Sequence, residues 1–209
     1  MPSKKYTFLV GAPGSRWSGI GQLISENFDY NTTDKSPERQ YIHGSFSGHS
    51  GSYFGPEMEL GNDFHRLEQS YMGSARFEAM CNSPFKTLSD KPKLIKCHQF
   101  AYGLDWLKEN IQGSNILLVK RDSDKSFDWW KQAGGWDISY PNYAWYVDDV
   151  HMQHYIDTEI KLANIFVNST GNEWATFDKK WLDENFGESD VEIPDSYSDV
   201  EVCLIHTFW

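Results

Sequence analysis

Hydrophobic and polar residues occur along the chain in blocks that predict strands followed by helices. Residues 5–10, 93–97 and 115–120 are short, largely apolar runs of the kind that form buried strands. The first run leads into residues 16–27, where apolar residues recur at helical spacing. The N-terminal half therefore opens with a strand that passes directly into a helix.

The second half of the chain predicts more helices. Residues 103–112 and 142–168 have amphipathic patterns, the second of them long. A further helix is expected to open at Ser123 as its N-cap residue. Residues 173–187 are typical of a strand, a turn and a short helix that stops at Gly187.

Other segments lack such patterns. Residues 29–62 are polar and glycine-rich and predict an irregular insertion, which in a compact domain is usually functional or mobile. Residues 63–82 predict a helix broken near Gly73. Residues 188–209 form an acidic, turn-rich tail, whose apolar last ten residues have no clear role. The 209 residues are expected to form a single domain.

The alternation of strands and helices predicts an α/β fold, with three layers and a mostly parallel sheet flanked by helices. Ligands of such sheets bind beyond the carboxyl ends of the strands. Three segments follow predicted strands in this way: residues 11–18, 96–98 and 120–123. We expect them to converge on one edge of the sheet.

Composition narrows the function classes. Lys and Arg total 19 against 30 Asp and Glu, and the formal charge of −11 argues against a nucleic-acid partner. No apolar run reaches 18 residues and no signal region precedes the first strand, so neither a membrane span nor secretion is expected. Three scattered cysteines favour a reducing cytoplasm.

The first turn has the composition of an anion site. In "GAPGSRWSG", residues 11–19, glycines allow close approach of the backbone, Ser15 and Ser18 offer hydroxyls, and Arg16 carries a charge. An ordinary strand–helix connection with a surface arginine would look the same. A triphosphate loop needs a lysine followed by Ser or Thr, which is absent here, so a ligand that needs no metal fits better.

With these features the chain resembles the sulfotransferases that use 3'-phosphoadenosine 5'-phosphosulfate. The first turn keeps the Gly-Ala-Pro entry of that family, but Gly14 stands where the family has Lys or Arg, and Arg16 follows two residues later. "PKLIKCH" is similar to the strand that ends in Lys-Thr-His, with Lys96 and His98 on the Lys and His. Cys97 replaces the Thr.

The third motif, "ILLVKRDSDKS", resembles the segment that binds the 3'-phosphate. Arg121 falls on the family's phosphate-binding arginine. Trp129 stands where the serine of this motif is expected, so Ser123 or Ser126 would substitute, and we take Ser126. The resemblance covers residues 5–28, 92–133 and 142–187. The family's C-terminal Arg-Lys-Gly cofactor motif is absent.

The resemblance implies sulfuryl transfer to a hydroxyl or amine of a small-molecule or saccharide acceptor, without a metal and with adenosine 3',5'-bisphosphate as product. His98 would be the general base, and Lys96 and Arg16 would stabilise the charge on the transferring group. Arg121 and Ser126 would hold the 3'-phosphate. The aromatic-rich residues 129–146 are candidates for the acceptor site. The 5'-phosphate would lie in the turn formed by Pro13, Gly14, Ser15, Arg16, Trp17 and Ser18.

Two other functions stay open: a small-molecule kinase of the P-loop type and a non-catalytic nucleotide-binding module on the same fold. Individual residues also have structural explanations. His98 could be a hydrogen-bonded core residue, and Arg121 could pair with Asp122 or Asp124. His151 and His154 share a helix face near Asp148, but the sequence shows no third cluster of metal ligands. Nothing in the sequence indicates the oligomeric state.

Overall fold

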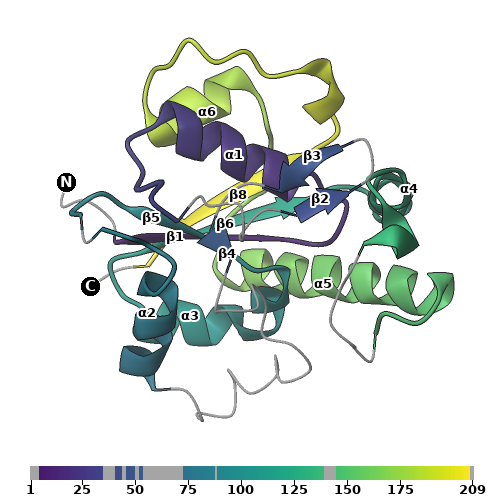
Figure 1. Ribbon diagram of the computed structural model, residues 1–209, viewed down its shortest axis with the longest axis horizontal. Coiled ribbons are helices and arrows are strands. Elements are labelled where there is room, and N and C mark those ends of the chain that lie inside the picture. The colour runs from purple at the N-terminus through teal and green to yellow at the C-terminus, as the bar shows by residue number, and fades with distance from the viewer. Residues whose placement is uncertain are drawn as a thin grey trace.

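The computed structural model describes residues 5–34, 41–43, 46–49, 52–53, 73–87, 89–138 and 145–207. These residues form a six-stranded sheet in the order β4-β5-β1-β6-β8-β7, with helices on both of its faces (Figure 1). The predicted α/β class is confirmed. The sheet is mixed: β4, β5, β1 and β6 pair in parallel as predicted, whereas β8 runs antiparallel to β6 and β7.

The strands of this sheet are β1 (Tyr6–Gly11), β4 (Ser52–Tyr53), β5 (Lys93–Lys96), β6 (Asn115–Lys120), β7 (Ala175–Thr176) and β8 (Glu201–His206). A separate antiparallel pair consists of β2 (Tyr41–His43) and β3 (Phe46–His49). The helices are α1 (Trp17–Asn27), α2 (Ser74–Asn82), α3 (Leu104–Asn110), α4 (Ser123–Gln132), α5 (Asp149–Ser169) and α6 (Lys179–Phe186).

The parallel half of the sheet is centred on β1, which pairs with β5 on one side and β6 on the other. Every residue of β1 is buried, as expected for a strand covered on both faces. Leu9 pairs with Lys96 and Gly11 with Val119, so the three strands end at the same edge of the sheet. The three segments that follow them are thereby brought together.

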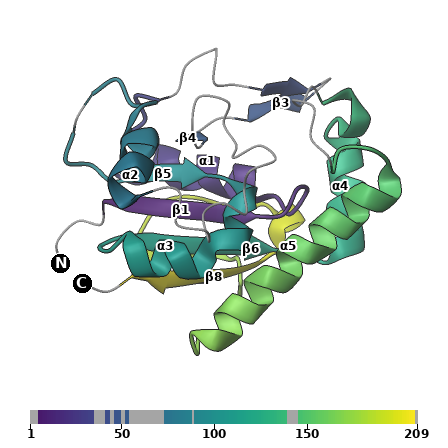
Figure 2. The ribbon, with the colours of Figure 1, turned by 90° about the horizontal axis from the view of Figure 1, so that it is seen from below.

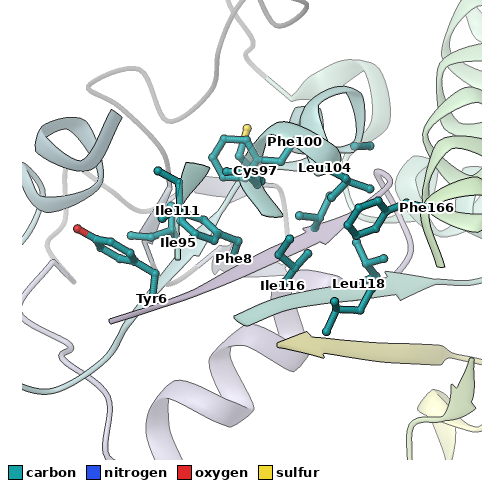
Figure 3. Packing of buried hydrophobic residues seen from close by; sticks show 14 of the residues in the cluster. Tyr6, Phe8, Ile95, Cys97, Phe100, Leu104, Ile111, Ile116, Leu118 and Phe166 are labelled. Atoms are coloured by element: carbon teal, nitrogen blue, oxygen red, sulfur yellow. The ribbon is translucent and has the colours of Figure 1, made fainter. Parts of the chain in front are cut away.

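The side chains of β1 alternate between two hydrophobic cores. Phe8 packs on the face covered by α2, α3 and α5, with Phe100, Ile116 and Phe166 around it (Figures 2 and 3). Leu9 faces α1 and α6 on the opposite side. Full burial of one such apolar side chain stabilises the fold by about 1.5–3 kcal/mol. The strand that leads into the first turn is therefore held firmly on both faces.

The apolar end of the predicted acidic tail is part of the sheet. β8 pairs antiparallel with β6 along its whole length, from Glu201 opposite Lys120 to His206 opposite Asn115. Val202 belongs to the core on one face of the sheet and Cys203 to the core on the other, which fits a strand between two layers. Residues 188–209 therefore do not end as an appended tail, because their last part lies between β6 and β7.

Several helix boundaries differ from the predictions. The N-cap of α4 is Asp122 rather than Ser123, because the Asp122 carboxylate accepts a hydrogen bond of 3.1 Å from the Lys125 amide. The long helix α5 begins at Asp149 instead of residue 142, capped by Asp148. None of the helices among the described residues is long and apolar enough to span a membrane.

The glycine-rich insertion contributes strands where it is described. Its residues 52–53 form β4, which adds to the edge of the main sheet beside β5, and residues 41–43 and 46–49 form the separate pair. The other residues from 35 to 62 lie outside the described residues. The helix expected over 63–82 is described only from Gly73, and α2 begins directly after this glycine.

Candidate functional site

The candidate site lies at the carboxyl edge of β1, β5 and β6. The turn from Ala12 to Arg16 joins β1 to α1 and has the β5–η3 junction and the β6–α4 junction as its neighbours in the sheet. Here η3 is the 3-10 helix His98–Gly103. The predicted catalytic and cofactor-binding residues are on these three connections or in the first turns of the helices that follow them, except Lys96, which is the last residue of β5.

Two backbone positions give the turn its shape. Gly14 has φ +78°, and a Cβ on it would lie 1.8 Å from the Ser126 carbonyl oxygen. The turn therefore packs directly against α4, at a distance that only glycine permits. Arg16 also has a positive φ, 67°, which is unfavourable for a residue with a side chain. Such strained residues concentrate at functional sites.

Two serine hydroxyls at this turn are buried without a partner. Ser15 and Ser126 are both fully buried, and neither Oγ makes a hydrogen bond within the described part of the chain. Ser15 Oγ lies against Gly11, 2.8 Å from the position of an added Cβ. A buried hydroxyl without a hydrogen bond costs about 1–3 kcal/mol. Both serines were predicted from the sequence to contact phosphate.

His98 lies at the end of β5 in an enclosed aromatic environment. The rings of Trp17, Trp145 and Tyr155 are 6.1, 5.8 and 5.7 Å from its ring, centre to centre. Its Nδ1 is 2.8 Å from Glu159 Oε1, and only 4% and 1% of these two side chains are exposed. His98 is therefore beside the first turn, but inside the protein.

The partner of His98 was missed by sequence analysis. Glu159 lies on α5, on the face that also carries the buried residues Ile156 and Ala163. A glutamate in the apolar stripe of an amphipathic helix was the available signal. The carboxylate fixes the ring orientation, and a neutral His98 that donates from Nδ1 carries its lone pair on Nε2. This arrangement suits a general base.

Lys96, like His98, lies beside Trp17. Its side chain is fully buried, and its Nζ lies 5.9 Å from the centre of the Trp17 ring. Gly21 makes room for it, because a Cβ there would be 3.2 Å from Lys96 Cδ. The Trp17 ring thus contacts both the predicted base and the predicted lysine.

Arg16 extends in another direction. Its guanidinium carbon is 3.8 Å from the centre of the Trp129 ring and 5.3 Å from that of Tyr197. Its Nη1 donates to Ser196 Oγ over 3.3 Å, and its Nε is buried without a hydrogen bond in the described residues. Burial lowers the pKa of Arg16, and the positive charge of Arg121 lowers it further. Arg16 is therefore close to Arg121.

Arg121 forms a bidentate ion pair with Asp199. Its Nε and Nη2 donate to the two carboxylate oxygens over 2.9 and 2.8 Å. Lys125 Nζ lies 3.1 Å from the same carboxylate. The pKa of Asp199 is lowered by the Arg121 hydrogen bond and by Lys125, against the opposing effect of burial. The partner of Arg121 is thus neither Asp122 nor Asp124, which the sequence suggested as alternatives.

The remaining predicted residues are placed as follows. Pro13 is part of the turn, and Ser18 is in the first turn of α1. Of the aromatic segment 129–146, Trp130 and Trp145 pack with Tyr155 in a buried cluster, and residues 139–144 lie outside the described ones. His151 Nδ1 contacts its helix cap Asp148 over 2.8 Å. In the described ranges, no group of three or more side chains could hold a metal ion.

No family model, curated protein or solved structure matches the chain. Function has to be argued from the site itself.

Proposed function

We propose that the protein is a sulfotransferase that transfers a sulfuryl group from 3'-phosphoadenosine 5'-phosphosulfate to a hydroxyl or amine of a small-molecule or saccharide acceptor. One observation carries the proposal. Residues from three separate strand ends gather around one turn: two arginines, a histidine paired with a carboxylate of α5, and two buried serine hydroxyls that have no partner among the described residues. Buried hydroxyls and clustered guanidinium groups are suited to phosphate oxygens.

In the proposed reaction His98 Nε2 accepts the proton of the acceptor as its oxygen or nitrogen attacks sulfur. The bond between sulfur and the bridging oxygen of the 5'-phosphate breaks, and adenosine 3',5'-bisphosphate leaves with the electron pair. Glu159, 2.8 Å from Nδ1, stabilises the imidazolium that forms. Lys96, whose Nζ lies 5.9 Å from the centre of the Trp17 ring, would stabilise the charge on the sulfuryl oxygens.

The turn and the arginines would bind the nucleotide. The N-terminal end of α1 and the Ser15 hydroxyl would take the 5'-phosphate. Arg121 and Ser126 would take the 3'-phosphate. Because Arg16 contacts Trp129 and Tyr197 and is close to Arg121, we assign it to this phosphate side rather than to the transferring group. The mechanism as proposed needs no metal.

The finer description of the fold belongs to the same proposal: a three-layer architecture of the P-loop or sulfotransferase kind, in which β1, the turn and α1 form the phosphate-binding unit. A cytoplasmic location also remains a proposal. It agrees with Cys81, Cys97 and Cys203, which are buried and form no disulfide within the described part of the chain.

Ligand-induced stabilisation tests the proposal. Adenosine 3',5'-bisphosphate at 100 times its Kd, without magnesium, should stabilise the fold by about 2.7 kcal/mol. For a chain of this size that corresponds to a rise in Tm of roughly 5–10 °C. ATP with magnesium should give a smaller shift. Arg121→Met should reduce the effect of the bisphosphate, whereas Arg76→Met, at an exposed position on α2, should not.

The proposal is wrong if millimolar adenosine 3',5'-bisphosphate leaves the Tm unchanged. A larger shift with ATP and magnesium than with the bisphosphate would instead indicate a kinase-like nucleotide site.

A further inference from the structure

We propose that Asp199 is a built-in competitor for the anion site: its carboxylate occupies the guanidinium edge of Arg121 that would otherwise bind the 3'-phosphate of the nucleotide, and it withdraws when that phosphate binds. The inference rests on the proposed function and adds a residue that sets the affinity and selectivity of the same site. Asp199 would then make the protein hold 3'-phosphorylated nucleotides less tightly than its cations alone would allow.

The geometry of the ion pair is that of phosphate recognition. A guanidinium group has five N–H donors, and a carboxylate on two of them imitates two oxygens of a phosphate. Asp199 uses Nε and Nη2 of Arg121, and the Lys125 carbonyl accepts from Nη1 over 3.3 Å. A phosphate that needs the same edge must displace the carboxylate.

Asp199 can leave without disturbing the fold around it. Its side chain is 28% exposed, whereas the next residue, Val200, is fully buried. The Val200 carbonyl accepts a hydrogen bond of 2.9 Å from the Phe177 amide, and the Val200 amide donates to the Tyr197 carbonyl over 3.0 Å. The backbone is thus anchored on both sides, so that rotation of the Asp199 side chain into solvent would free Arg121.

The charges around Asp199 show why a ligand-free site would need such a group. Burial and the positive charge of Arg121 both lower the pKa of Arg16, and Lys125 Nζ lies 3.1 Å from the Asp199 carboxylate. Asp199 supplies one negative charge among these three cations. A phosphate dianion supplies more negative charge, and Ser126 adds a buried hydroxyl without a partner in the described residues. Carboxylate and phosphate repel each other, so one of them leaves.

A fixed supporting role for Asp199 predicts the opposite effect. If the carboxylate only orients Arg121 for the ligand, its loss weakens binding. If it competes, its loss strengthens binding. The sign of the change in affinity therefore separates the two roles.

The experiment is calorimetric titration of the wild type, Asp199→Asn and Asp199→Ser with adenosine 3',5'-bisphosphate and with adenosine 5'-monophosphate. We expect both variants to bind the bisphosphate about tenfold more tightly, a change of about 1.4 kcal/mol. Binding of the monophosphate should change less than twofold. Asp195→Asn is the matched control, because it removes the same charge from the same exposed segment.

Weaker binding of the bisphosphate by both variants, or an equal gain for the monophosphate, overturns the role of Asp199 while the proposed function stands. An equal gain in Asp195→Asn also overturns it, because the effect would then come from net charge. If no form of the protein binds the bisphosphate, the proposed function fails, and this inference fails with it.

Discussion

The two sides of the first turn differ in the burial and in the type of their side chains. On one side, His98 and Glu159 are almost fully buried among aromatic rings. On the other, Arg121 meets Asp199 and Lys125 in a partly exposed network of charges. A buried pair among apolar rings keeps water away from a proton transfer, whereas an exposed cluster of cations can capture a charged ligand from solution.

One backbone feature accounts for this division. Arg16 and Trp17 are adjacent, yet Arg16 contacts Trp129 and Tyr197 while Trp17 contacts Lys96 and His98. Arg16 has left-handed backbone geometry at the entry to α1. The chain changes direction at this residue, so consecutive side chains serve different sides of the site. The left-handed backbone at Arg16 thus separates the proposed anion-binding half of the site from the proposed proton-transfer half.

The largest expected effect tests the proton-transfer half. His98→Gln keeps a donor for Glu159 but removes the base, so sulfuryl transfer should fall by roughly 10²–10⁴-fold. The Kd of adenosine 3',5'-bisphosphate should change less than twofold, because the nucleotide is assigned to the other half. The measurements are initial rates with radiolabelled 3'-phosphoadenosine 5'-phosphosulfate over a panel of phenol and sugar acceptors, and calorimetry for the Kd.

Two further variants make this test specific. Glu159→Gln should lower kcat by about 10–100-fold with KM nearly unchanged, as expected for a residue that positions the base. His154→Gln, at an exposed position on α5, is the matched control and should have no effect. A His98→Gln protein that loses nucleotide affinity in proportion to its rate would mean that the two halves are not separate.

The sequence predicted which residues come together at the site better than it predicted their hydrogen-bond partners. β1, β5 and β6 form where apolar runs were found, and their parallel pairing brings Ser15, His98 and Arg121 to one edge. Local patterns carry this information, because strand and turn residues are close in sequence. By contrast, Glu159 lies 61 residues from His98, and Asp199 lies 78 residues from Arg121. Such pairs are created by packing and leave no local pattern.

The role of the C-terminal segment was unpredictable for the same reason. β8 joins the sheet by pairing with the edge of β6 that faces away from β1. This pairing depends on the order of the strands in the sheet rather than on the sequence of β6 or β8. That placement also sets Asp199, two residues before β8, beside Arg121 at the end of β6. The prediction of Ser123 as the N-cap of α4 was a smaller error. The observed N-cap is Asp122, and Ser123 is an equally good capping residue one position later.

An intermediate effect is expected from Ser126→Ala on the anion-binding half. Removing a buried hydroxyl that has no partner in the described residues should leave stability unchanged or raise it by about 1 kcal/mol. The affinity for adenosine 3',5'-bisphosphate should nevertheless fall about tenfold, because a hydrogen bond to a charged phosphate is lost. Urea denaturation and calorimetry measure the two changes.

The control for this variant is Ser114→Ala. Ser114 is also fully buried, and its hydroxyl has no partner among the residues that the structure describes, but it precedes β6 at the opposite end of that strand from Arg121. The same gain in stability is expected, without a change in affinity. Equal losses of affinity in both variants would remove Ser126 from the ligand site.

The smallest effect concerns the pH dependence of the charged half. The pKa of Asp199 is lowered from 3.8, chiefly by the hydrogen bond from Arg121, so this ion pair stabilises the fold above the unfolded pKa. The contribution is lost as pH falls through the lower folded pKa. Partial exposure limits it to about 1 kcal/mol or less.

In urea denaturation, the wild type should be more stable than Asp199→Asn at pH 7, and the difference should disappear well below the unfolded pKa. His154→Gln, at an exposed position on α5, should follow the wild type at both pH values. If Asp199→Asn is as stable as the wild type at pH 7, the Arg121–Asp199 pair contributes nothing to the stability of the ligand-free protein. The role of Asp199 would then be measurable only through the affinity for the ligand.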